Sequence, residues 1–93
     1  MPGGYAEASV KEKDVAAAAA FAVKAQEKTL QKKDAPPVKL ALVKILSAQT
    51  QVVAGLNFRL KLSVRMHDAP KQAEAVVYRK LSGEYELTSW VWK

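Results

Sequence analysis

An alanine-rich segment near the amino terminus restricts the folds that this chain can form. The run has high intrinsic helix propensity, and winding it at about 100° per residue gathers its apolar side chains on one side of a helix. Ala18, Ala19 and Ala22 lie at the centre of that side, and the bulkier Phe21 and Val23 lie toward its edges. A flat partner could not cover such a surface, whereas a strongly curved sheet could wrap over the alanines. The segment therefore predicts a helix held inside a curved sheet.

The sequence around this segment indicates where the helix begins and ends. Ser9 and Glu12 have the Ser-x-x-Glu spacing of a capping box, which predicts a helix start at this point. Lys32 and Lys33 complement the negative end of the helix dipole, so we expect the helix to reach about Lys33. The Pro-Pro pair that follows cannot continue a helix and holds the connection extended.

The remainder of the chain shows the period of two that is typical of strands. The segment Phe58–Met66 alternates apolar residues with basic or polar ones, which favours an antiparallel sheet with one wet face. The alternation before it changes parity at Lys44, which predicts a bulge or a strong bend. We expect strands at 38–47, 58–66, 73–81 and 85–92, a short edge strand at 5–8, and a loop at 67–71. The fold class is therefore α+β, with one long helix wrapped by a four- to five-stranded antiparallel sheet.

Composition excludes several classes of function. The 93 residues are enough for a single domain, 1–93, in which residues 1–4 are expected to form a mobile arm. No cysteine is present, which excludes disulfide scaffolds, thiol catalysis and thiolate metal sites. No metal cluster or cofactor motif is visible, so no cofactor is expected. The single histidine, His67, has no serine or cysteine nucleophile motif to accompany it, and we do not expect an enzyme.

The net charge of +6 raises the question of an anionic partner. The basic residues are spread over predicted strand and helix surfaces and form no nucleic-acid recognition motif, so no nucleic acid is expected. Binding to nucleic acid that weakens steeply with salt remains a lower-ranked alternative. No apolar run approaches the ~18 residues of a membrane span, and no membrane partner is expected. No signal peptide is visible, which leaves a cytoplasmic protein or a secreted one whose signal peptide has been removed.

The turn between the two longest predicted strands has an unusual composition. Hairpin tips are usually polar, with Asn-Gly or Asp-Gly at the turn. Here the tip is Gln51-Val52-Val53-Ala54-Gly55, which places two β-branched apolar residues where no core can receive them. Exposed apolar tips of this kind are typical of binding surfaces.

Three motifs of the chain now coincide with those of one family. They are Pro2-Gly3-Gly4 near the amino terminus, Phe21-Ala22-Val23 in the helix, and the Gln51–Gly55 hairpin. Together they closely resemble the cystatin superfamily of cysteine-protease inhibitors, over nearly the whole chain. The absence of cysteine makes the chain similar to the stefins and to the plant cystatins in particular.

The resemblance implies a reversible, tight-binding competitive inhibitor of papain-like cysteine proteases such as papain and the cathepsins. In that family the amino-terminal arm, the first hairpin and the second hairpin form a wedge that enters the active-site cleft. Carried over to this chain, the protease-binding residues are Gly3, Gly4, Gln51, Val52, Val53, Ala54, Gly55, Leu81 and Ser82.

The resemblance has one departure and leaves alternatives open. Many cystatins carry Pro-Trp at the second hairpin, whereas residues 80–84 contain no Trp and Leu81 is the candidate substitute. The alternative function is a cystatin-fold binding or scaffold protein without inhibitory activity. We expect a monomer. Strain at Val52-Val53 would also allow the first hairpin to open and form a domain-swapped dimer.

Overall fold

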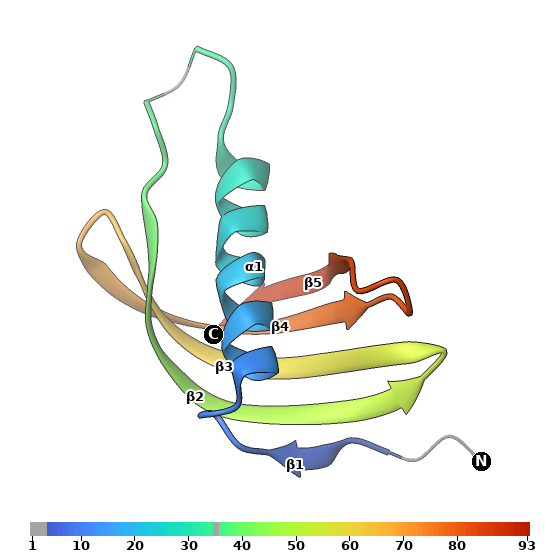
Figure 1. Cartoon of the computed structure of the whole chain (residues 1–93). Helices are drawn as coiled ribbons and strands as arrows, with labels where there is room; N and C mark the ends of the chain where they lie inside the picture. The colour runs from blue at the N-terminus through green and yellow to red at the C-terminus, as the bar shows by residue number, and fades with distance from the viewer. Residues whose placement is uncertain (1–3, 35) are drawn as a thin grey trace.

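The structure is a computed structural model that describes residues 4–34 and 36–93 (Figure 1). One helix precedes a meander of long strands, and all the strands form a single antiparallel sheet in the order β1-β2-β3-β4-β5. The predicted class, α+β with one helix and a four- to five-stranded antiparallel sheet, is confirmed, and the sheet has five strands. The elements are β1 (Ala6–Ala8), α1 (Lys13–Leu30), β2 (Leu40–Val53), β3 (Gly55–Met66), β4 (Ala69–Arg79) and β5 (Tyr85–Trp92). Among the described residues, no helix is long and apolar enough to cross a membrane.

The sheet curves around α1, as the alanine-rich face of the helix predicts (Figure 1). Ala18, Ala19 and Ala22 are fully buried, so the small side chains let the strands approach the helix closely. The bulk of the core comes from the sheet, because large side chains on β3 point toward the helix. Burial of each large apolar side chain stabilises the fold by about 1.5–3 kcal/mol. The largest fully buried side chains are Phe58, Leu60, Leu62, Val15, Val64 and Val77.

Bulges produce the curvature. The register between β2 and β3 shifts between Leu42 and Lys44 and again between Ile45 and Ser47. The first shift lies at the parity change seen in the sequence, so the predicted bulge is confirmed. A third shift, between Val76 and Val77 of β4, accommodates an additional residue on β5. Extra residues of this kind bend a strand and increase its twist.

The helix is shorter than the sequence predicts. It begins at Lys13, and its N-cap, Glu12, makes no side-chain capping bond, so the predicted capping box is wrong. Ser9 instead accepts a hydrogen bond from the backbone N–H of Lys11 at 3.1 Å, which closes a local turn before the helix. The helix ends at Leu30 rather than near Lys33, because Gln31 is already in an extended conformation.

Side chains near the helix end hold the start of β2. The Gln31 Oε1 atom accepts a hydrogen bond from the N–H of Val38 at 2.8 Å. The Glu27 carboxylate accepts one from the N–H of Leu40 at 3.0 Å. These bonds satisfy backbone donors that have no strand partner there, which fixes the long connection to the helix.

The predicted loop at 67–71 is wrong in its second half. The turn consists of His67 and Asp68, both with positive φ, and β4 begins directly afterward at Ala69. Pro70 pairs with Arg65 of β3, whereas the pairing of β4 with β5 begins only at Ala73. Because this part of β4 is an edge, the missing N–H of proline breaks no ladder bond.

Candidate functional site

Three separate segments meet at one end of the sheet (Figure 1). They are Gly4, which lies two residues before β1, the β2–β3 hairpin and the β4–β5 turn. Antiparallel order requires this arrangement, because β1, β3 and β5 begin at the end where β2 and β4 finish. The structure therefore brings together Gly4, the Gln51–Gly55 hairpin and the Leu81–Ser82 turn. Gly3, also predicted from the sequence, lies outside the described residues.

The β2–β3 hairpin has a very tight tip. Val53 pairs with Gly55, which leaves Ala54 alone at the turn. Val52 is 74% exposed, Ala54 is also exposed, and Val53 is half-buried. The apolar tip predicted from the sequence is thus presented to solvent.

Backbone strain in this hairpin falls on the glycine and not on the valines. Gly55 has a φ of 120°, a conformation that side chains disfavour. Non-glycine residues with positive φ in the described parts of the chain are Asp34, His67 and Asp68, all far from this tip. The strain expected at Val52-Val53 therefore does not take the form of left-handed backbone.

Strand β4 holds the hairpin tip in place. The Tyr78 hydroxyl donates a hydrogen bond to the carbonyl of Ala54. A Cβ atom at Gly55 would lie 2.4 Å from the carbonyl oxygen of Arg79 and 2.9 Å from the ring of Tyr78. Only glycine allows this close approach between β3 and β4. At the base of the tip, the Asn57 amide donates to Gln51 Oε1 at 3.2 Å.

The β4–β5 turn is closed by its own backbone. The N–H of Lys80 donates to the carbonyl of Glu84 at 2.8 Å, and the N–H of Gly83 donates to the carbonyl of Lys80 at 2.8 Å. Leu81 is 86% exposed and Ser82 is exposed beside it. An added Cβ at Gly83 would meet nothing within 4 Å. The turn thus presents an apolar side chain without packing against neighbouring strands.

A shallow groove connects the two hairpins. It has a volume of about 220 Å³. Its lining residues are Gly55, Leu56, Arg79, Lys80 and Leu81. Apolar groups from both hairpins and the basic Arg79 and Lys80 therefore border one groove.

Sequence reasoning missed Tyr78 and Asn57 as parts of this site. The buried Val77 would have placed Tyr78 on the opposite face of β4 by alternation. Tyr78 reaches Ala54 because the register of β3 and β4 places Asn57 opposite Tyr78. Periodicity in the sequence carries no information on that register. His67 lies at the opposite end of the sheet, in the turn between β3 and β4 (Figure 1).

A family model described as aspartic acid proteinase inhibitor matches residues 8–91. The chain belongs to the aspartic acid proteinase inhibitor family. The match includes both hairpins and begins after Gly4. No curated protein sequence is significantly similar to this chain.

Solved structures show which fold this family member has. Dimeric human cystatin F superposes with a TM-score of 0.80 at 14% identity, covering 100% of this chain and 88% of that one. A salivary cystatin from the soft tick Ornithodoros moubata gives 0.74 at 18% identity, covering 100% and 99%. Mialostatin, a gut cystatin from the hard tick Ixodes ricinus, gives 0.76 at 14%, covering 97% of each chain. The family member therefore has the cystatin fold that the sequence resemblance implies.

Proposed function

We propose that this protein is a reversible, competitive inhibitor of papain-like cysteine proteases and that the three-segment end of its sheet is the binding edge. The observation that carries the proposal is the Gln51–Gly55 hairpin, whose apolar tip is both exposed and held in one shape by Tyr78 and Gly55. Membership of a proteinase inhibitor family supports an inhibitor over an enzyme or a scaffold.

A tip of this geometry would inhibit a protease without being cleaved. A protease must place an extended peptide across its catalytic groove, whereas Val53 and Gly55 are paired on either side of a closed turn. The tip therefore occupies the cleft without a scissile bond in register. Immobilising a side chain on binding costs roughly 0.5–1.5 kcal/mol of free energy. Because the tip is already ordered before binding, little of this cost arises on association.

The second candidate function is inhibition of aspartic proteases. The description of the matching family favours it, and the matched range contains both hairpins and the groove between them. The two candidates differ in the target class and not in the fold, so a comparison of proteases separates them. A scaffold protein without inhibitory activity is the remaining alternative.

The test is a titration of papain and of pepsin with the wild-type chain and two valine variants. Val52→Asp places a charge on the exposed tip, and Val43→Asp makes the same change at an exposed position of β2 outside the binding edge. We expect papain inhibition to weaken by about 100-fold or more for Val52→Asp, as for a central interface residue. Val43→Asp should inhibit like the wild type.

The possible results discriminate clearly among the candidates. Inhibition of pepsin alone would replace the proposal with the aspartic-protease candidate. Failure of the folded wild-type chain to inhibit either enzyme would leave the scaffold alternative. Equal inhibition of papain by both valine variants would remove the first hairpin from the binding edge.

A further inference from the structure

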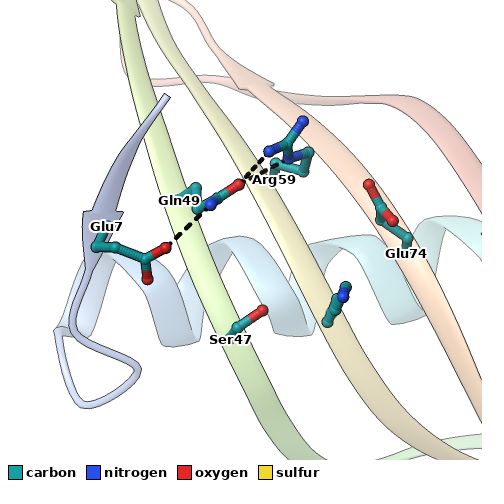
Figure 2. A pocket seen from close by; sticks show the side chains of 6 residues that line it. Glu7, Ser47, Gln49, Arg59 and Glu74 are labelled. Carbon is teal, nitrogen blue, oxygen red and sulfur yellow. Dashed lines mark hydrogen bonds between the residues drawn. The ribbon is translucent and has the colours of Figure 1, made fainter. Parts of the chain in front are cut away.

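A row of hydrogen-bonded polar side chains crosses the outer face of the sheet, away from α1 (Figure 2). The row consists of Glu7 on β1, Gln49 on β2 and Arg59 on β3, which face one another in the strand register. The Gln49 Nε2 atom donates to Glu7 at 3.0 Å. Arg59 Nε donates to Gln49 Oε1 at 2.8 Å, and its Nη2 atom donates to the same oxygen.

The row ends next to the amino-terminal part of the binding edge. The guanidinium carbon of Arg59 lies 4.5 Å from the centroid of the Tyr5 ring, within the range of a cation–π contact. Tyr5 directly follows Gly4. Arg59 therefore contacts the amino-terminal segment through the ring of Tyr5 and, by way of Gln49, through Glu7.

Strand β1 has little else to hold it. It consists of three residues, Ala6–Ala8, and pairs with β2 alone. Ala6 and Glu7 are exposed, and only the partly buried Ala8 packs against the core. Short edge strands of this kind separate easily from a sheet. The polar row and the Tyr5 contact therefore add side-chain interactions that hold β1 in place, because its backbone pairing with β2 is short.

The chemistry of Arg59 allows it to hold Gln49 and Tyr5 at the same time. Its planar guanidinium can donate in a fork to one amide oxygen and stack on an aromatic ring at the same time, which a lysine cannot do. None of the ion pairs found among the described residues includes Arg59. The contacts of its guanidinium are with Tyr5 and Gln49, and Gln49 links it to the Glu7 carboxylate. The row borders an open pocket of about 430 Å³, so it is not part of the core.

We propose that Arg59 is a positioning residue that fixes Gly4 and Tyr5, the described amino-terminal part of the binding edge. The inference rests on the proposed function where it concerns protease affinity, but its structural part does not. In this role Arg59 acts through other residues: it reduces the motion of Tyr5 and β1 and so fixes the position of Gly4 at the binding edge.

The experiment compares two arginines on the same strand and the same outer face. Arg59→Gln removes the fork and the ring contact, and Arg65→Gln makes the same charge change outside the row. The first readout is the backbone ¹H–¹⁵N heteronuclear NOE of Tyr5 and Glu7 in the free protein. We expect a clear decrease for Arg59→Gln and wild-type values for Arg65→Gln, with partial retention in Arg59→Lys. Unchanged NOE values in Arg59→Gln would overturn the proposal.

The second readout is the affinity for papain, measured for each variant in the full chain and in a chain that begins at Tyr5. In the full chain we expect Arg59→Gln to weaken binding roughly three- to tenfold. In the shorter chain the same change should have less than about a twofold effect, because the arm is gone. An equal loss in both chains would show that Arg59 acts on the sheet and contradict the positioning role. If the wild-type chain does not bind papain, the proposed function fails, and the NOE comparison alone decides the role of Arg59.

Discussion

The two hairpins at the proposed binding edge both expose an apolar residue, but only the first is supported by the rest of the sheet. Ala54 accepts a hydrogen bond from Tyr78, and Gly55 lies against the backbone of β4. The second turn is closed only by its own backbone bonds, and Leu81 is 86% exposed. Ordering a mobile side chain or turn on binding has a free-energy cost that an ordered one avoids. We therefore expect the first hairpin to contribute more binding free energy, although valine is smaller than leucine.

The largest expected effect concerns the glycines of the two hairpins. Gly55→Ala combines a positive φ with a collision against the Arg79 carbonyl, and should destabilise the fold by roughly 3 kcal/mol or more. Gly83→Ala has a φ of 96° but open space around it, so strain alone should cost about 1 kcal/mol. Urea unfolding measures both values. Similar losses for the two variants would show that the first hairpin is no more constrained than the second.

Truncation of the two exposed apolar residues tests the comparison directly. Val52→Ala should weaken papain binding about tenfold, because a preordered residue at the centre of an interface carries more of the binding free energy. Leu81→Ala should weaken it by roughly threefold, despite the greater loss of apolar area. Stopped-flow dissociation rates give both numbers. A larger effect for Leu81→Ala would reverse the proposed order of the hairpins.

Removal of the Tyr78 hydroxyl group tests whether β4 holds the tip of the first hairpin in place. Tyr78→Phe keeps the ring against Gly55 but removes the hydrogen bond to Ala54, and should weaken papain binding about fivefold, equivalent to ~1 kcal/mol. Tyr85→Phe is the control, because the Tyr85 ring packs against Phe21 and Phe58 on the core side. Isothermal titration gives the affinities. An unchanged affinity in Tyr78→Phe would mean that the tip keeps its shape without β4.

The smallest effect is expected at the base of the second hairpin. The Lys80–Glu84 ion pair has a separation of 3.8 Å, and both side chains are largely exposed. Glu84→Gln keeps the backbone carbonyl that closes the turn, so stability and papain affinity should change by less than about 0.5 kcal/mol. A clearly larger change in thermal stability would show that this turn depends on its charges.

The sequence predicted the fold well because its strongest signals are local. The alanine-centred helix face, the alternation in Phe58–Met66 and the parity change at Lys44 each depend on residues a few positions apart. The helix start was misplaced because Ser9 closes a turn of its own before Lys13. Local patterns do not distinguish a side chain that caps a helix from one that stabilises a turn.

The contacts that support the proposed binding edge could not be predicted in the same way. The Gln51–Gly55 motif is contiguous, so it was visible in the sequence. The contacts from Tyr78 to Ala54 and from Arg59 to Tyr5 join residues on separate strands, and they depend on register and twist. A shift of one residue would have moved either side chain to the opposite face of the sheet.

The most direct test of the central claim is hydrogen–deuterium exchange of the chain in complex with papain whose catalytic thiol has been blocked. The blocked enzyme leaves the inhibitor intact and isolates binding from chemistry. If the first hairpin is the main contact, the amides of residues 51–57 should be protected more strongly than those of residues 80–84, while the His67–Asp68 turn at the far end is unchanged. A stable complex in which residues 51–57 gain no protection would contradict the account.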